Sequence, residues 1–214
     1  MTIPAMEDCL HLPLKDVLSI IQYRILNQSM YFGIRAFKSP IDFWIYQEIL
    51  FESRPDFIIE IGNCWGGSTL ALAHLCDCLG KGQVIALDVS HAGLSDAVRR
   101  HPRILPIEGD ACQSFAKVRS LVGDGDDVLV IEDSSHTFDN TLRVLTTYSA
   151  LIKADGYFIV EDGIINHGLD GGPSPGPYEA INAFIASHPD FEIDRTRESF
   201  LITWNPKGYI RRAR

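Results

Sequence analysis

Apolar and polar positions alternate along this chain in two different periods, and the changes of period predict strands that alternate with helices. Short apolar runs indicate strands buried on both faces, whereas apolar residues at helical spacing indicate helices. The expected strands are residues 57–61, 83–87, 103–107, 127–131 and 157–160. The helices expected after them are residues 68–79, 95–100, 112–121, 141–152 and 178–187. This order predicts an α/β fold with a Rossmann-like, doubly wound and mostly parallel sheet.

Two further helices are expected before the first strand, at residues 15–30 and 42–53. We therefore divide the chain into an N-terminal helical segment, residues 1–54, and a main domain, residues 55–214. The segment is expected to act as a lid, as an oligomer surface, or as both. It holds more large apolar side chains than a lid requires, which predicts a homo-oligomer, a dimer or larger, formed through residues 15–50. The aromatic side chains behind this expectation are Tyr31, Phe32, Phe37, Phe43 and Trp44.

The C-terminal part contains a long loop and two weaker strand signals. Residues 163–177 are rich in glycine and proline and too poor in apolar residues to pack as an element. We therefore expect a mobile loop that covers the active site. Residues 191–193 and 200–204 are expected to form an antiparallel hairpin at the sheet edge. The basic tail, residues 207–214, is expected to be solvated.

Residues 56–69 organise these elements, because a strand, a glycine turn and a helix follow one another directly. The turn reads Glu-x-Gly-x-x-x-Gly-Gly-Ser and not the Gly-x-Gly-x-x-Gly of a dinucleotide site. An acidic residue before the first glycine suits a ligand with cationic groups and hydroxyls, and S-adenosylmethionine has both. The alternative is that Glu60 only caps backbone groups and that the glycines only tighten the turn.

The later strands also end in acidic residues, and the carboxyl ends of parallel strands share one edge of the sheet. Asp88 follows the second strand, where an acid commonly binds ribose hydroxyls. Asp110 follows the third strand and suits an adenine edge, although a helix cap is an equally good explanation. The predicted cofactor-binding residues are Glu60, Gly62, Asn63, Gly66, Ser68, Asp88, Asp110 and Ala111.

A second acidic group follows the fourth and fifth strands. Asp133, Glu161 and Asp162 have no Lys or Arg near them in sequence, and their oxygens predict a site for a hard cation, Mg²⁺ or Mn²⁺. The alternative is a pair of helix caps without a metal. His136 is the predicted general base, with Asp133 as the second catalytic residue. A capping or supporting role is the alternative for His136, and His167 in the glycine-rich loop is a weaker candidate base.

Charge and cysteine content restrict the partners and the compartment. The 214 residues carry a formal net charge of −9, which argues against nucleic-acid binding. No segment has the pattern of a signal peptide or a membrane span, so no membrane partner is expected. The five cysteines form no Cys-x-x-Cys pair and indicate a reducing, cytoplasmic setting.

Residues 38–52 read Lys-Ser-Pro-Ile-Asp-Phe-Trp-Ile-Tyr-Gln-Glu-Ile-Leu-Phe-Glu and resemble the lead-in of the cephalosporin hydroxylase family, also called the rhamnosyl O-methyltransferase family. The resemblance extends to about residue 210. The other matching segments are residues 54–56, 59–62, 66–68, 160–162 and 176–181. The resemblance implies the class I S-adenosylmethionine-dependent methyltransferase fold. It also implies a metal held by residues that match Asp133, Glu161 and Asp162.

The glycine turn is also similar to that of catechol O-methyltransferase, which has a basic lysine where this chain has His136. The sequence therefore predicts a metal-dependent S-adenosylmethionine O-methyltransferase that acts on a hydroxyl of a small natural product or sugar. Since some family members are named as hydroxylase components, one alternative is a cofactor-binding accessory component of a hydroxylase system in antibiotic biosynthesis. A nucleotide-binding oxidoreductase is a further alternative, although the glycine spacing predicts no NAD. The acceptor and the position that is methylated stay open.

Overall fold

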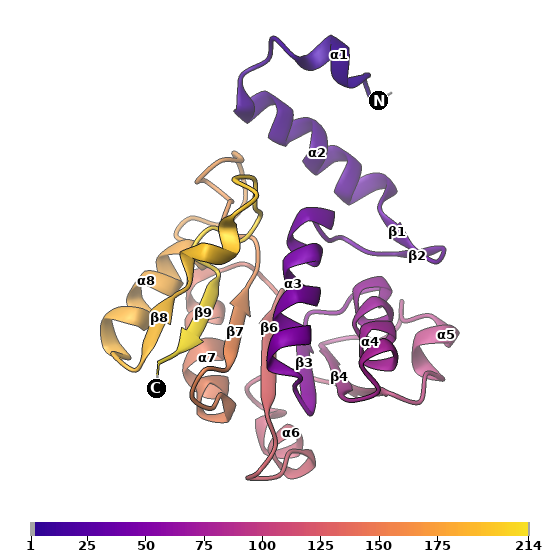
Figure 1. Ribbon diagram of the computed structural model, residues 1–214, viewed down its shortest axis with the longest axis vertical. Coiled ribbons are helices and arrows are strands. Elements are labelled where there is room, and N and C mark those ends of the chain that lie inside the picture. Colours follow the sequence, from indigo (N-terminus) through magenta and orange to yellow (C-terminus); the bar gives the residue numbers. More distant parts are fainter. Residues whose placement is uncertain (1–2, 214) are drawn as a thin grey trace.

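The computed structural model describes residues 3–213, so the outermost ends of the expected segments 1–54 and 55–214 lie outside the described residues. A seven-stranded sheet forms the centre, in the order β5-β4-β3-β6-β7-β9-β8 (Figure 1). β9 runs antiparallel to both of its neighbours, β7 and β8, and all other neighbouring strands of this sheet pair in parallel. The strands are β3 (Phe57–Ile61), β4 (Gln83–Asp88), β5 (Ile104–Glu108), β6 (Val128–Glu132), β7 (Tyr157–Val160), β8 (Phe191–Ile193) and β9 (Tyr209–Arg212). The predicted fold class is confirmed.

Helices cover both faces of this sheet, and each face has its own apolar core. Successive residues of a strand point to opposite faces, so Ile59 packs on one side and Ile58 on the other. One face packs against α6 (Phe115–Leu121), α7 (Phe138–Tyr148) and α8 (Pro177–Ser187). The other packs against α3 (Pro40–Ser53), α4 (Gly67–Leu79) and the short α5 (Asp96–Arg99). Because both faces are covered, the central strands read largely as apolar runs, as in Val128–Ile131 of β6 and Tyr157–Val160 of β7.

The N-terminal segment divides between the core and the edge of the sheet. Helix α3 begins after Ser39, whose side chain caps it, and it buries Ile45, Ile49 and Leu50 against the sheet. The elements before it are α1 (Met6–Cys9), α2 (Leu14–Gln28), β1 (Met30–Tyr31) and β2 (Ile34–Arg35). Figure 1 places α1 and α2 above the rest of the molecule, away from the sheet. The boundary at residue 54 stays a prediction, but α3 belongs structurally to the sheet.

A third apolar cluster attaches α2 to the loops at this end of the molecule. Leu18 and Ile25 of α2 pack with Ile164, Leu169 and Trp204. Ile164 and Leu169 of the loop are therefore buried against α2, while residues 163–176 form no helix or strand, as expected from their few apolar residues.

The C-terminal hairpin differs from the expectation in one strand. Residues 200–204 form no strand, and the partner of β8 is β9, which lies within the expected solvated tail. Tyr209 and Ile210 are fully buried, because β9 inserts between β7 and β8. The adjacent Arg211 and Arg212 interrupt the apolar pattern by which a strand is predicted from sequence. Arg211 pairs with Glu192 of β8, and Arg212 pairs with Asp190 just before it.

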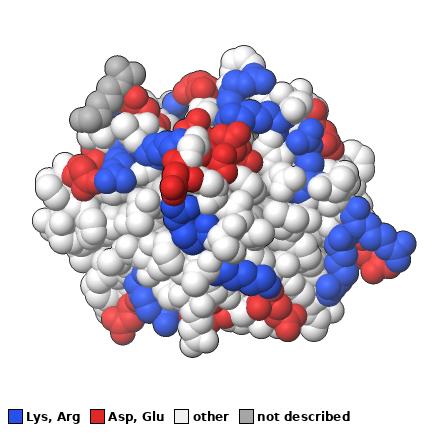
Figure 2. Space-filling model, turned by 90° about the horizontal axis from the view of Figure 1, so that it is seen from below, with Lys and Arg blue, Asp and Glu red and all other residues white. Residues whose placement is uncertain are grey.

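The surface mixes charges of both signs. Figure 2 shows Lys and Arg interspersed with Asp and Glu over the face seen from below. Among residues 3–213, no helix is both long and apolar enough to cross a bilayer.

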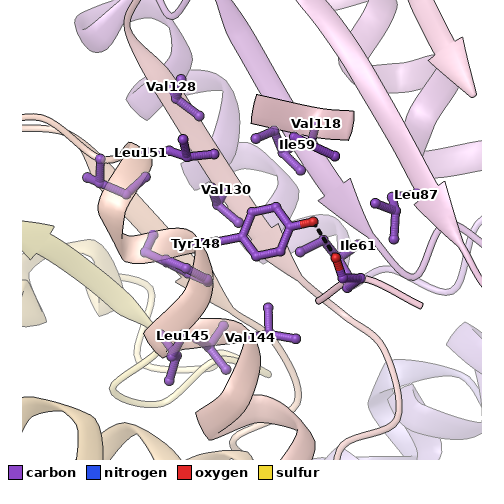
Figure 3. Close-up of a cluster of buried hydrophobic side chains, with 14 of the residues drawn as sticks. Ile59, Ile61, Leu87, Val118, Val128, Val130, Val144, Leu145, Tyr148 and Leu151 are labelled. Atoms are coloured by element: carbon purple, nitrogen blue, oxygen red, sulfur yellow. Dashed lines mark hydrogen bonds between the residues drawn. The ribbon is translucent and has the colours of Figure 1, made fainter. Parts of the chain in front are cut away.

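Tyr148 connects the core on the α7 face to the turn after β5. Its ring lies among buried aliphatic side chains, and its hydroxyl donates a hydrogen bond of 2.8 Å to the carbonyl of Ala111 (Figure 3). A buried acceptor that loses a hydrogen-bond donor costs free energy. We therefore expect Tyr148→Phe to lower the free energy of unfolding by about 1–2 kcal/mol, measured by urea denaturation.

Tyr178→Phe is the matched control. The Tyr178 ring stacks on His167, and removal of its hydroxyl leaves that stacking intact. We expect a change within about 0.5 kcal/mol for this variant. Equal losses in the two variants would contradict the importance of the buried hydrogen bond.

Candidate active site

A cavity of about 420 Å³ opens at the carboxyl ends of the parallel strands. The chain reverses its direction of travel through the sheet between β3 and β6, which is where open α/β sheets bind ligands. Ten of the residues predicted from the sequence line this cavity: Gly62, Asn63, Ser68, Asp88, Asp110, Ala111, Asp133, His136, Glu161 and Asp162. Glu60 and Gly66 are not among the residues that line it.

Glycine is required in the turn after β3 because the backbones of two strands nearly touch there. Gly62 has a φ of +90°, and a Cβ at this position would lie 2.0 Å from the carbonyl oxygen of Asp133. Gly66 has a φ of +83°, and a Cβ there would lie 2.6 Å from Leu94 Cδ1. The turn thus brings β3 against the start of the loop that carries Asp133. Its glycines shape the site, whether or not they contact a ligand.

Glu60 lies beneath the turn and not on the cavity wall. It is fully buried, and one carboxylate oxygen accepts a hydrogen bond from the hydroxyl of Thr69, near the start of α4. Burial raises the pKa of Glu60, and the positive charge of Lys38 opposes this rise. Glu60 thus contacts a side-chain hydroxyl of α4, while its second oxygen has no partner within residues 3–213, and its predicted contact with a cofactor stays a prediction.

Asn63 presents unsatisfied polar groups to the cavity. Its side chain is 2% exposed, and within residues 3–213 neither Oδ1 nor Nδ2 has a hydrogen-bond partner. Leaving buried amide groups without partners costs free energy unless a ligand or water satisfies them. Asn63 therefore fits a polar ligand at the glycine turn.

Asp88 and Asp110, the predicted ribose-binding and adenine-binding residues, both accept hydrogen bonds from backbone N–H groups. Asp88 accepts hydrogen bonds from the N–H groups of Cys64, at 2.8 Å, and Ser90, at 3.2 Å. Asp110 accepts from the N–H of Gln113 at 3.0 Å and from Arg143 at 2.8 Å. The Gln113 N–H, followed by Arg143, holds the pKa of Asp110 below its usual value. Both carboxylates line the cavity. Asp110 also caps the backbone N–H of Gln113, which was the alternative to an adenine contact.

A lysine pairs with two of the three carboxylates after β6 and β7, contrary to the expectation of an unpaired cluster. Lys38 Nζ lies 2.6 Å from Asp133 Oδ2 and also forms an ion pair with Glu161 Oε1. The Lys38 side chain is only 8% exposed. Burial alone would lower the pKa of Lys38, but the two carboxylates outweigh it and raise that pKa above its usual value. Sequence proximity could not identify this partner, because Lys38 lies 95 residues before Asp133.

A second grouping brings His136 to the same carboxylates. His136 Nε2 lies 3.4 Å from Asp162 Oδ2 and 3.9 Å from Asp133 Oδ1. His136 and Asp162 have φ angles of 54° and 57°, in the left-handed region, and such strained backbones commonly serve to aim a side chain. Burial raises the pKa of Asp162 to about 6.

This grouping fits a divalent cation. Asp133, His136 and Asp162 each offer one donor atom, and the three atoms lie within 4.8 Å of one another. An octahedral ion with ligands at about 2.1 Å places its ligand atoms roughly 3 to 4.2 Å apart. The predicted ligands Asp133 and Asp162 are therefore brought together, while Glu161 is turned toward Lys38.

Buried polar contacts that the sequence analysis did not predict hold the wall of the cavity formed by α3 and residues 203–205. Asp42 on α3 accepts hydrogen bonds from the hydroxyls of Thr203 and Tyr209 and from the N–H of Trp204. The side chain of Asn205 accepts a 3.3 Å hydrogen bond from the N–H of Asp162, a residue of the candidate metal site. Their position in the resembling stretch 38–52 was the only signal for Lys38 and Asp42.

The Trp204 indole connects this wall of the cavity to α2. Its Nε1 donates a hydrogen bond of 2.6 Å to Gln22, which also lines the cavity. The weaker candidate base, His167, is not among the lining residues. It lies 2.6 Å from Glu179 and stacks on Tyr178, with ring centres 3.8 Å apart.

Known proteins resemble this chain over most of its length. The family model described as Rhamnosyl O-methyltransferase/CmcI matches residues 23–213. The chain belongs to this family. Rhamnosyl O-methyltransferases of Mycobacterium tuberculosis H37Rv and Mycobacterium leprae TN are each 34% identical to it over 193 residues. The matches cover 87% of this chain and 79% and 84% of the relatives. The predicted family and enzyme class, an S-adenosylmethionine-dependent O-methyltransferase, are confirmed.

Solved structures share the fold of this family member. A CmcI structure described as Mg-SAM has a TM-score of 0.70 and 23% identity, covering 87% of this chain and 77% of that one. An O-methyltransferase from Bacillus cereus in complex with SAH has a TM-score of 0.57 and 19% identity, covering 86% and 84%.

A buried glutamate below the site makes stability depend on pH. Glu132 at the end of β6 accepts hydrogen bonds from Ser134, at 2.5 Å, and Asn140, at 3.2 Å, and its second oxygen has no partner within residues 3–213. Burial raises its pKa from 4.5 to about 8. Between about pH 4.5 and about pH 8, Glu132 therefore keeps its proton in the folded chain but loses it in the unfolded chain. The contribution of Glu132 to stability consequently falls as the pH rises through this range.

We expect Glu132→Gln to remove this dependence. Between about pH 5 and about pH 8, the wild type should lose stability relative to the variant by roughly 1 kcal/mol per pH unit. Urea denaturation of both proteins at several pH values measures the difference. Parallel stability curves across this range would contradict the assignment.

Proposed function

We propose that this chain transfers a methyl group from S-adenosylmethionine to a hydroxyl of a small natural product or sugar, with the help of a divalent cation. One observation carries the proposal: a single cavity joins the unsatisfied Asn63 at the glycine turn to the donor atoms of Asp133, His136 and Asp162. The names of the mycobacterial relatives support a sugar hydroxyl as acceptor, and the CmcI form described as Mg-SAM supports the cofactor and ion.

The cofactor side of the cavity is formed by the turns after β3, β4 and β5. S-adenosylmethionine supplies a methyl group on a sulfonium, which a nucleophile can displace. Asn63 offers an amide for its polar groups, and the carboxylate of Asp88 lies where ribose hydroxyls bind in this fold. Arg143 fixes the carboxylate of Asp110 at the third turn. Glu60 acts from beneath by holding the start of α4.

The acceptor side is formed by α2 and the loops after β6 and β7. Gln22, Ile25 and Leu26 of α2 line it together with Trp204. An amide, aliphatic side chains and an indole suit an acceptor with an apolar ring face and polar substituents. The wall directs one face of the acceptor toward the acidic group, and it excludes water from the reacting end.

The reacting end holds the acidic group. A divalent ion held by Asp133 and Asp162 would supply positive charge that favours ionisation of the acceptor hydroxyl. Lys38 fixes the orientation of the Asp133 carboxylate. Two roles are open to His136, proton acceptor and metal ligand, because its Nε2 lies 3.4 Å from Asp162.

Cofactor binding and transfer should separate in two variants. Asn63→Ala removes the unsatisfied amide and should weaken S-adenosylmethionine binding by about 1–3 kcal/mol, measured by calorimetry. Asp133→Asn should leave that affinity within about threefold of the wild type but abolish transfer of labelled methyl to a rhamnosyl acceptor. EDTA should do the same to the wild type, and Mg²⁺ or Mn²⁺ should restore transfer.

The outcomes distinguish the parts of this proposal. Full turnover in EDTA would contradict the proposed need for a cation. Binding of cofactor without transfer to any hydroxylated acceptor would favour an accessory component. Unchanged cofactor affinity in Asn63→Ala would move the cofactor away from the glycine turn.

We also propose that the chain is a cytoplasmic homo-oligomer assembled through the N-terminal segment. All five cysteines are unpaired, as expected in a reducing compartment. Three large side chains project into solvent: Phe32 at the tip of the β1–β2 hairpin is 81% exposed, and Trp44 and Phe51 on the outer side of α3 are 59% and 64% exposed. Exposed aromatic residues at this density are typical of interfaces.

Light scattering at micromolar protein should therefore give the mass of a dimer or larger. Trp44→Glu with Phe51→Lys should shift the mass toward the monomer without loss of helix content, because both side chains point away from the core. Phe200→Lys, at an exposed position on the C-terminal side, serves as the control. A monomeric wild type would refute the assembly.

A further inference from the structure

The cavity beside the glycine turn carries a cation that has no counter-ion in the protein. Arg35 and Lys38 are the two Lys or Arg residues that line the cavity, and Lys38 is paired with Asp133 and Glu161. Within residues 3–213, Arg35 forms no ion pair, and its guanidinium can therefore bind an anionic group of a ligand. The remaining charged lining residues are acidic: Asp42, Asp88, Asp110, Asp133, Glu161 and Asp162.

The backbone of Arg35 lies against the start of α4. Arg35 ends the short strand β2, and a Cβ at Gly67, the first residue of α4, would lie only 2.3 Å from the carbonyl oxygen of Arg35. The guanidinium carbon lies over the Trp65 ring, 5.5 Å from its centre, which is the distance of a cation–π contact. Burial raises the pKa of the Cys64 thiol, and the charge of Arg35 opposes this rise. The positive charge of Arg35 therefore acts at the glycine turn.

Two further features of the same turn favour an anion. The N-cap residue of α4 is Gly66, so no side chain caps the N–H groups of the first helical turn. These N–H groups and the positive end of the helix dipole attract negative charge. Asn63, 2% exposed, lines the cavity here, and its amide has no hydrogen-bond partner in the described part of the chain. Guanidinium, helix terminus and amide thus place hydrogen-bond donors at one end of an otherwise acidic cavity.

Resting on the proposed function, we infer that Arg35 binds the carboxylate of the amino-acid end of S-adenosylmethionine. This end of the cofactor carries an ammonium and a carboxylate on the same carbon. The acidic side chains of the cavity attract the ammonium and repel the carboxylate, so the carboxylate is directed to the Arg35 side of the turn. Arg35 then favours the complete cofactor over its decarboxylated form, which keeps the adenosine, the sulfonium and the amine.

Calorimetry of the full chain with S-adenosylmethionine and with decarboxylated S-adenosylmethionine tests this inference. Arg35→Gln should weaken binding of the complete cofactor by about fivefold, the size of effect typical of a partly exposed ion pair. The same variant should not weaken binding of the decarboxylated form, because that ligand has no carboxylate to lose. Arg24→Gln is the matched control: it removes an equal charge from an exposed position of α2 outside the cavity and should not change the ratio of the two affinities.

The two ligands separate recognition of the carboxylate from support of the turn. Equal weakening of both ligands in Arg35→Gln would overturn the inference, since Arg35 would then only hold the glycine turn in place. Unchanged affinity for both would also overturn it. Either result leaves the proposed function standing, because the wild type still binds the cofactor. A wild type that binds neither ligand would overturn the proposed function together with this inference.

Discussion

A buried ammonium group joins parts of this molecule that are far apart in the chain. Lys38 comes from the connection before α3, Asp133 from the end of β6 and Glu161 from the end of β7. A buried charge without a partner costs several kcal/mol, so neither the lysine nor the two carboxylates can stay buried without the others. The N-terminal segment is therefore bound to the edge of the sheet by electrostatics as well as by apolar packing, and the acceptor side of the cavity is fixed relative to the glycine turn.

A second buried contact reinforces this attachment from the other end of the chain. Asp42 accepts three hydrogen bonds from residues 203–209, and Asn205 in the same stretch holds the backbone of Asp162. The loop after β7 is consequently held between α3 and the C-terminal strand pair. Such support allows Asp162 to keep its left-handed backbone, because the surrounding contacts determine its position more strongly than its own preference.

The parallel strands could be predicted from the sequence because burial on both faces makes them largely apolar, as in Val128–Ile131 of β6 and in β7. β9 could not, because only Tyr209 and Ile210 are fully buried and two arginines follow them. The acidic residues of the site were found because they directly follow strands. Their lysine partner was missed because an ion pair across 95 residues leaves no local pattern. The pairing of Glu161 with the same lysine could not be predicted either.

Helix α2, which lines the cavity, is attached to the molecule by a small apolar cluster of its own. Leu18 and Ile25 pack with Ile164, Leu169 and Trp204, and this cluster is separate from both cores of the sheet. Substitutions of Gln22 or Leu26, which line the cavity from α2 outside this cluster, therefore put little of the global folding free energy at risk. Changes at these two positions would alter the proposed acceptor wall, while the turns after β3, β4 and β5 remain tied to the rigid sheet.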